Sequence, residues 1–127
     1  MGRTTFSSPD APSAIGPYSQ AVSSGDHIFL SGQTPIDPAG GALVEADVAG
    51  QAQRCFDNLG AVLAAAGLTF DDVVKVNVYL TSMDDFAEMN TVYARQFVEP
   101  FPARTTVAVA ALPLGARIEI ELVARLR

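Results

Sequence analysis

The spacing of apolar residues changes along the first half of the chain, from a strand-like alternation to a helical period, and each spacing predicts one kind of secondary structure. In residues 18–33, two short runs flank Gly25-Asp26 and alternate apolar with polar side chains, which predicts a β-hairpin with Ile28 and Leu30 on one face. Between about Asp47 and Ala66 the spacing is helical, and Gly67 follows where a helix commonly ends with glycine. The helix is expected to bury Val48, Ala52, Cys55, Leu59, Val62, Leu63 and Ala66.

The second half of the chain alternates between strand and helix patterns. Residues 71–82 predict a strand whose inner side chains are Val74, Val76, Val78 and Leu80. A helix with an apolar stripe of Phe86, Met89, Tyr93 and Phe97 is expected to begin at Ser82 or Asp84 and to stop at the prolines of "EPFP". Two final apolar runs, Thr105–Leu112 and Arg117–Leu126, predict strands joined by a turn.

This order of elements predicts an α/β fold of the α+β kind, in which two helices pack on one face of a mixed sheet. Two helices cannot cover both faces, yet the run "TTVAVAAL" is apolar on both sides of its strand. An exposed apolar sheet face is most simply buried against other copies of the chain in closed cyclic symmetry. The pattern therefore favours a homo-oligomer.

Composition narrows the class of protein. The 127 residues fit one domain, of which residues 1–10 are expected to form a flexible leader. The net charge of −6 and the scattered basic residues argue against a nucleic-acid partner, most clearly duplex DNA, while an RNA role stays open. No apolar run reaches the length of a membrane span and the N-terminus lacks the apolar core of a signal peptide, so a cytoplasmic protein is expected.

Residues with obvious catalytic potential are few. One histidine and one cysteine cannot build a zinc site of the usual ligand types, and no acidic cluster resembles a calcium loop, so no metal is expected. His27 has no serine or carboxylate nearby in the sequence that would indicate a catalytic triad. Cys55 lies within the helical apolar stripe, a position typical of an unreactive thiol in the core. Neither residue is predicted to be catalytic, and no cofactor is expected.

Two charged residues interrupt the apolar runs near the end of the chain. In "RIEIELVAR" the period of two places Glu119 on the face opposite Ile118 and Ile120, while Arg104 precedes the apolar run before it. A lone buried charge is costly, so each must have a partner or lie in a cleft. If the last two strands form a hairpin, Arg104 lies nearer to Arg125 than to Glu119. An interface ion pair and a cleft for a small acid both stay open, since a guanidinium binds a carboxylate through two parallel hydrogen bonds.

Four blocks of the sequence resemble one protein family. They are "IGPYSQAV", "LSGQTPID", "NVYLTSMDDFAEMN" and "FPARTTVAVAALPLGARIEIELVA", in this order from about Ala11 onwards. On these blocks the chain resembles the reactive intermediate deaminase family, RidA, also called YjgF or the L-PSP endoribonuclease family. The resemblance implies a chorismate-mutase-like fold and a homotrimer with three ligand clefts between its subunits.

The resemblance also implies roles for individual residues. The family arginine that binds the substrate carboxylate matches Arg104, and the glutamate that holds or activates a water matches Glu119. Other cleft positions of the family match Tyr18, Ser31, Gly32 and Asn90. Many deaminases of the family have cysteine two residues after the arginine, where this chain has Thr106. The exchange is tolerated if that cysteine acts through its backbone carbonyl, and it changes substrate size or activity if the side chain shapes the pocket.

The reaction implied by the resemblance is hydrolysis of 2-imino or enamine acids to 2-keto acids and ammonia. Such intermediates are released by pyridoxal-phosphate dehydratases acting on serine and threonine, so a functional link to those enzymes is expected. The residues suit this chemistry, because an electrophilic imine needs orientation, polarisation and a delivered water. Two alternatives stay open: an endoribonuclease, and a trimeric carboxylate-binding or chaperone-like module without turnover.

Overall fold

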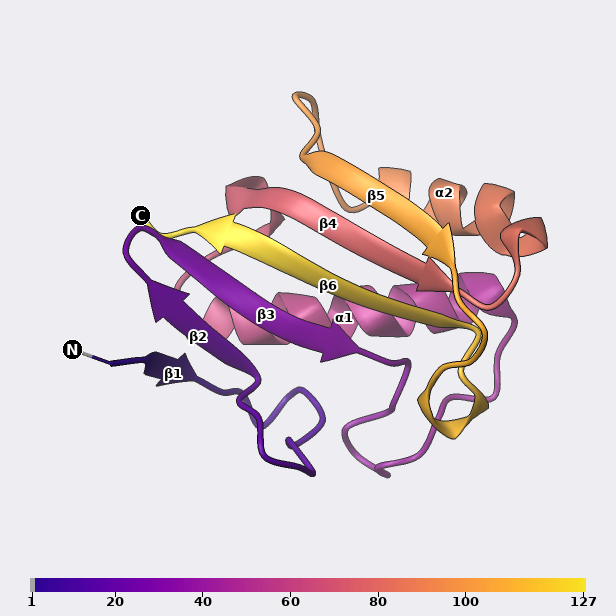
Figure 1. Ribbon diagram of the computed structural model, residues 1–127, viewed down its shortest axis with the longest axis horizontal. Coiled ribbons are helices and arrows are strands. Elements are labelled where there is room, and N and C mark those ends of the chain that lie inside the picture. The colour runs from indigo at the N-terminus through magenta and orange to yellow at the C-terminus, as the bar shows by residue number, and fades with distance from the viewer. Residues whose placement is uncertain (1) are drawn as a thin grey trace.

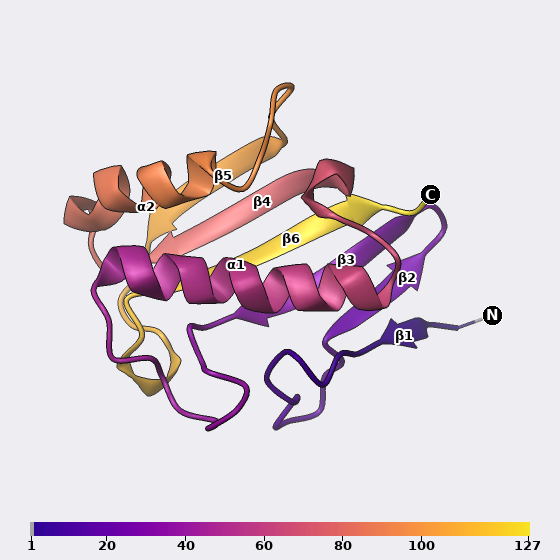
Figure 2. The same ribbon diagram turned by 180° about the vertical axis from the view of Figure 1, so that it is seen from behind.

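A six-stranded mixed sheet forms the centre of the computed structural model, which describes residues 2–127. The strand order is β1-β2-β3-β6-β4-β5. The strands are β1 (Thr4–Phe6), β2 (Ala21–Ser24), β3 (His27–Gln33), β4 (Val73–Leu80), β5 (Ala103–Ala108) and β6 (Ile118–Arg125). The helices α1 (Val48–Ala65) and α2 (Phe86–Ala94) lie on one face of this sheet (Figure 1, Figure 2). The predicted α+β class, mixed sheet and one-sided helices are confirmed.

The predicted hairpin and first helix are both present. Strands β2 and β3 pair antiparallel across the Gly25-Asp26 turn. Asp47 caps α1, because its side chain accepts a hydrogen bond from the Gly50 amide. Gly67 follows the helix with a φ of 74°, a left-handed conformation that favours glycine. Local sequence signals therefore place both ends of α1 within one residue of the prediction.

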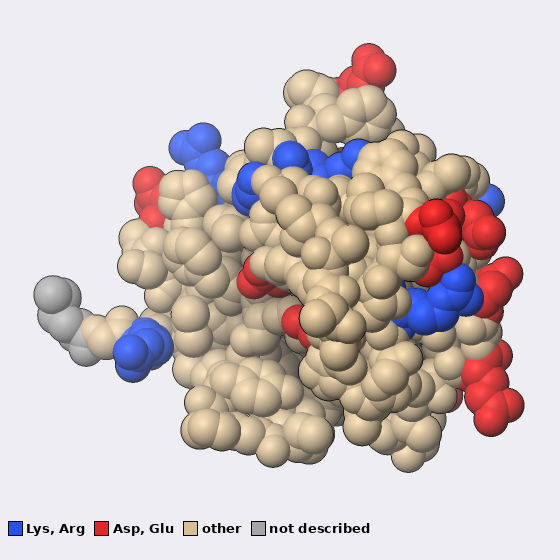
Figure 3. Space-filling view, turned by 45° about the vertical axis from the view of Figure 1, so that its right-hand side comes forward, with Lys and Arg blue, Asp and Glu red and all other residues tan. Residues whose placement is uncertain are grey.

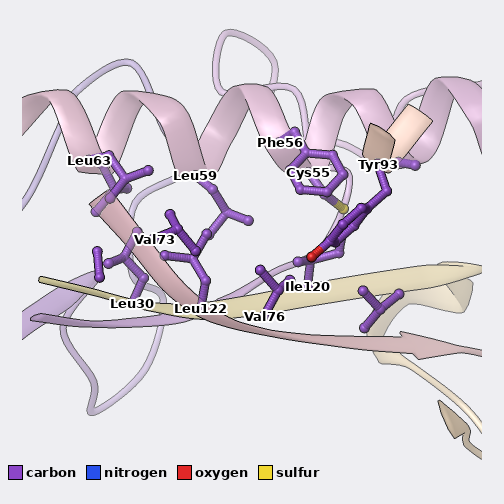
Figure 4. Packing of buried hydrophobic residues seen from close by; sticks show 14 of the residues in the cluster. Leu30, Cys55, Phe56, Leu59, Leu63, Val73, Val76, Tyr93, Ile120 and Leu122 are labelled. Carbon is purple, nitrogen blue, oxygen red and sulfur yellow. The ribbon is translucent and has the colours of Figure 1, made fainter. Parts of the chain in front are cut away.

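The core lies between α1 and the sheet (Figure 4). Its large, fully buried side chains include Ile28, Phe56, Leu59, Leu63, Val76, Ile118, Ile120 and Leu122. Aromatic rings join the two helices, and the centroids of Phe56 and Tyr93 lie 5.9 Å apart in an edge-to-face arrangement. Each large apolar side chain buried here contributes roughly 1.5–3 kcal/mol to folding. This layer fixes α1, β4 and β6 relative to one another.

The hairpin considered for the last two strands is absent. Strand β4 lies between β5 and β6, parallel to β5 and antiparallel to β6. A parallel neighbour requires a long crossover, which residues 81–102, including α2, supply. After β5, residues 109–112 lead into the 3-10 turn η3 (Pro113–Gly115) rather than extending the strand as predicted. Arg104 and Glu119 are therefore on strands separated by β4.

The start of β4 reverses the predicted faces of two valines. Val74 was expected inside, but it is exposed, and Val73 is buried instead. The register between β4 and β6 shifts between Val73 and Lys75, which is the signature of a β-bulge. One extra residue changes the side on which the preceding side chains lie, so the predicted alternation holds only from Val76 onwards.

The second helix is shorter than predicted. Ser82 accepts a hydrogen bond from the Asp84 amide, but it caps the 3-10 turn η2 (Met83–Asp85) that precedes α2. Helix α2 ends at Ala94, so Phe97, which was expected on the helical stripe, is buried from the segment after the helix.

Part of the expected leader belongs to the sheet. Strand β1 pairs antiparallel with β2. The buried side chain of Gln20 accepts a hydrogen bond from the Ser8 amide and donates to the carbonyls of Ser8 and Pro12. These bonds attach residues 8–12 to the start of β2, while Met1 lies outside the described residues. Within residues 2–127, no helix is long and apolar enough to cross a membrane.

Candidate active site

The predicted site residues separate into two groups within one chain. The first group lies beside α2 and contains Arg104, Asn90 and Thr106. The second lines a cavity at the ends of β3 and β6 and contains Tyr18, Ser31, Gly32 and Glu119. Strand register explains the separation. Arg104 is opposite Val76, which faces the core, whereas Glu119 is opposite Tyr79, three residues further along β4 and thus on the other face.

The guanidinium group of Arg104 is held by α2. Its Nη1 donates a 2.6 Å hydrogen bond to Oδ1 of Asn90, and its Cζ lies 4.6 Å from the ring centroid of Tyr93 and 5.5 Å from that of Phe86. A small cavity of about 340 Å³ opens beside it. Stacking and one hydrogen bond orient the planar group, and its other N–H donors, which have no partner within residues 2–127, can bind a carboxylate.

Two buried hydroxyl groups near Arg104 have no hydrogen-bond partner among the described residues. They are Oγ1 of Thr106, on the same strand, and Oη of Tyr93, whose ring stacks on the guanidinium. Burial raises the pKa of Tyr93, and the positive charge of Arg104 acts in the opposite direction. A buried unpaired hydroxyl costs roughly 1–3 kcal/mol. A polar ligand or a second chain that reached these oxygens would offset that cost.

The carboxylate of Glu119 lies directly against Gly32 of β3. A Cβ atom at position 32 would be 2.3 Å from Oε2 of Glu119, so only glycine leaves room for this contact. On the same face, Oε1 of Glu121 accepts a hydrogen bond from the Tyr79 hydroxyl and lies 3.5 Å from Nδ2 of Asn77. Burial raises the pKa of Glu119, and the negative charge of Glu121 raises it further. Glu119 is thus a stronger base than an ordinary carboxylate.

The cavity beside Glu119 has a volume of about 740 Å³. The strands β3 and β6, the segments 12–20 and 34–41, and η3 all contribute to its wall. In the space-filling view, acidic side chains are visible within the hollowed part of the surface (Figure 3). The exposed side chains of Ile15, Tyr18 and Leu114 line the same cavity. A pocket of this size and mixed lining is suited to a small organic ligand.

Ser31 uses both of its donors within the chain. Its hydroxyl donates a 2.6 Å hydrogen bond to the carbonyl of Ser19, and its amide donates to the carbonyl of Gln20. Ser31 therefore holds the segment that carries Tyr18 against the end of β3. Tyr18 is half exposed and faces the cavity.

Sequence reasoning missed the part played by Tyr79, Glu121 and Tyr93. By the period of two, Tyr79 and Glu121 lie on the outer faces of their strands, but their contact depends on β4 lying next to β6. Tyr93 was assigned to the apolar stripe of a helix, and its stacking on Arg104 depends on the position of β5. Cys55 is fully buried in the core as predicted, and burial raises its pKa far above the usual range. No cluster that could hold a metal ion occurs in residues 2–127.

Comparison with known proteins establishes the family. The family model described as Endoribonuclease L-PSP matches residues 8–126. The chain belongs to the L-PSP family. The resemblance to RidA and YjgF proteins, which rested on four sequence blocks, is confirmed.

Members of the L-PSP family with different names match nearly the whole chain. Protein DfrA of Myxococcus xanthus is 52% identical over 126 residues, covering 98% of this chain and 96% of DfrA. A human 2-iminobutanoate/2-iminopropanoate deaminase is 48% identical over 122 residues, covering 96% of this chain and 89% of the human protein. The crystal structure of E. coli TdcF with bound serine superposes with a TM-score of 0.92 at 40% identity, covering 98% of this chain and 99% of TdcF.

Proposed function

We propose that this chain is a deaminase that hydrolyses 2-imino acids and their enamine forms to 2-keto acids and ammonia. The proposal rests on the two chemically matched groups of the site, a free guanidinium fork at Arg104 and a carboxylate of raised proton affinity at Glu119. The human relative carries the name of such a deaminase, and TdcF was crystallised with serine, a small acid with an amino group next to its carboxylate. Enzymes that release small imino acids, such as pyridoxal-phosphate dehydratases, would supply the substrate.

The reaction follows from the chemistry of these two side chains. Arg104 binds the substrate carboxylate through two N–H donors and so orients the neighbouring imine carbon. Glu119 accepts a proton from a water molecule as the water oxygen attacks that carbon, giving a carbinolamine. Glu119 then returns the proton to the nitrogen, the same carboxylate carries the proton of the carbinol hydroxyl to that nitrogen as the C–N bond breaks, and ammonia leaves with the 2-keto acid. One water is consumed for each imine.

A single chain holds the two groups on opposite faces of its sheet, so we infer that two copies complete each site. In a homotrimer with cyclic symmetry, Arg104 of one copy would meet Glu119 of the next, giving three equivalent clefts. The open face of the sheet exposes Phe29 and Val107, apolar side chains that such an assembly would cover. The chorismate-mutase-like arrangement implied by the family resemblance belongs to the same proposal.

The proposed activity can be measured with a serine or threonine dehydratase that releases the imine in the presence of semicarbazide. Wild-type protein should divert the imine to keto acid before semicarbazide traps it, and Arg104→Ala should abolish that effect. Arg95→Ala is the matched control, because Arg95 is an exposed arginine just after α2 that is not among the site residues. The proposal fails if wild-type protein does not alter the partition, or if Arg104→Ala is fully active.

The shared site can be tested by mixing two inactive variants. Arg104→Ala retains Glu119, and Glu119→Gln retains Arg104, so random exchange of subunits should rebuild about one quarter of the intact clefts. Mixing after mild dissociation should therefore restore about a quarter of the wild-type activity. No recovery despite demonstrated exchange would show that each chain carries a complete site.

The remaining alternatives are outcomes of the same measurements. Binding of a keto acid that requires Arg104, without any acceleration of imine loss, would identify a binding module. Ribonuclease chemistry has little support, because His27 lies at the opposite end of β3 from Gly32 and Glu119, and the net charge is negative. RNA cleavage by wild type that disappears in Arg104→Ala would nevertheless assign that activity to this site.

A further inference from the structure

We propose that Tyr79 and Glu121 are positioning residues for Glu119. The Tyr79 hydroxyl fixes the Glu121 carboxylate, and this fixed negative charge keeps Glu119 a proton acceptor strong enough to activate the attacking water. The inference rests on the proposed function, because it takes Glu119 as the base of that reaction.

The geometry begins with the antiparallel pairing of β4 and β6. Tyr79 is directly opposite Glu119, and Asn77 is directly opposite Glu121. The long side chain of Tyr79 reaches diagonally to Glu121, as aromatic side chains do across neighbouring strands, and donates a hydrogen bond to its Oε1. The amide of Asn77 approaches the same oxygen. Glu121 is thus held from β4, while no described residue donates a hydrogen bond to the Glu119 carboxylate.

This arrangement holds one carboxylate in place beside another. Burial raises the pKa of Glu119, and the charge of Glu121 raises it further. The hydrogen bond to Glu121 also raises the pKa of Tyr79 to about 12, so the hydroxyl keeps its proton at neutral pH and remains a donor. Two carboxylates on one face interact most strongly when both are held in place, and Tyr79 restricts the movement of Glu121.

Several other titratable or charged groups lie around Glu119, and one of them explains why the negative charge of Glu121 is useful. Tyr18 lines the same cavity, Arg3 lines an adjoining cavity together with Glu121, and Cys55 lies on the core side of the sheet. In the proposed assembly, Arg104 of a second copy would also face Glu119. A nearby guanidinium weakens a carboxylate as a base, and the fixed charge of Glu121 opposes that effect.

A titration of Glu119 tests the inference without any substrate. The carboxyl carbon of Glu119 is followed by NMR against pH in wild type and in Glu121→Gln, Tyr79→Phe and Glu88→Gln. We expect the Glu119 midpoint to fall in Glu121→Gln and, by less, in Tyr79→Phe. Glu88→Gln removes the same charge from an exposed position on α2 and should leave the midpoint unchanged. An unchanged midpoint in Glu121→Gln, with native chemical shifts elsewhere, overturns the inference.

The imine assay then connects the titration with turnover. In Glu121→Gln the acid limb of the kcat/KM profile should move to lower pH, and the plateau should fall several-fold, less than the loss of about 100-fold expected for Glu119→Gln. Titration of the imine itself affects all variants equally. The double variant Tyr79→Phe with Glu121→Gln should resemble Glu121→Gln alone, because both changes act through one charge. A lower plateau with an unmoved acid limb contradicts the positioning role.

If the wild-type protein does not accelerate hydrolysis of the imine, the proposed function fails, whereas the NMR result still decides whether Glu121 acts on Glu119.

Discussion

Replacement of Gly32 by alanine should reduce activity while leaving the fold intact. The added Cβ would be 2.3 Å from Oε2 of Glu119 and 3.0 Å from its carboxyl carbon. Side-chain carbons keep at least 3.0 Å from such atoms, so the carboxylate must retreat by about 0.7 Å or rotate away. Gly32 has no positive φ, so its backbone conformation accepts alanine. Because the displaced atoms end a flexible, half-buried side chain, the thermal midpoint of unfolding should change little.

Activity should respond much more than stability. A displacement of about 1 Å in a catalytic group costs on the order of 100-fold in rate, so we expect kcat to fall by roughly 10- to 100-fold in Gly32→Ala. The measurement is the dehydratase-coupled assay, with KM and kcat determined separately. Gly40→Ala is the matched control, since a Cβ there meets nothing within 4 Å and the residue has no positive φ. Wild-type kcat in Gly32→Ala would refute the close contact between Glu119 and β3 as a requirement for catalysis.

Four further predictions address other parts of the molecule. Arg104→Lys keeps a positive charge but loses the planar fork, so KM should rise by about tenfold or more, and a change in kcat alone would contradict carboxylate binding. Within one chain the raised pKa of Glu119 means that its charged form destabilises the fold, so Glu119→Gln should increase the free energy of unfolding of the dissociated subunit at pH 7. That gain should disappear as the pH falls through the folded and then the unfolded pKa of Glu119, which urea melts at fixed protein concentration can follow. Thr106→Val removes an unpaired buried hydroxyl and should raise the free energy of unfolding in urea by about 1 kcal/mol, whereas a decrease would reveal a partner for that oxygen. The buried thiol of Cys55 should react with dithionitrobenzoate only when the chain opens, and rapid labelling of native protein would show otherwise.

The elements defined by local signals could be predicted from the sequence. The stripe of α1 and the glycine that follows it depend on neighbouring residues, and both are found in the structure, with Ala66 at the end of the stripe only partly buried. The bulge at Val73 could not be predicted, because a bulge is set by the partner strand rather than by the period of the valines.

The arrangement of the site depended on strand order, which the apolar pattern does not contain. Consecutive strands often pair, so Arg104 was considered on a hairpin with the strand of Glu119, but the crossover through α2 places β5 on the far side of β4. The family resemblance named the site positions without giving physical reasons for them. The contact of Gly32 with Glu119 and the bond from Tyr79 to Glu121 became evident only when β3, β6 and β4 were seen side by side.

The position of β6 also has a consequence for biosynthesis. Residues 118–125 are the last strand along the chain, yet they lie in the middle of the sheet, between β3 and β4. While the ribosome is still adding these residues, β3 and β4 each present an unpaired apolar edge, and α1 has no complete surface on which to pack. The two halves of the sheet can therefore join only after residue 125 has been translated. A premature stop before β6 would release a chain whose sheet is in two separate halves and which lacks Glu119. Such fragments would be targets for chaperones and proteases, so a chain whose core has folded is also one that carries both groups of the site.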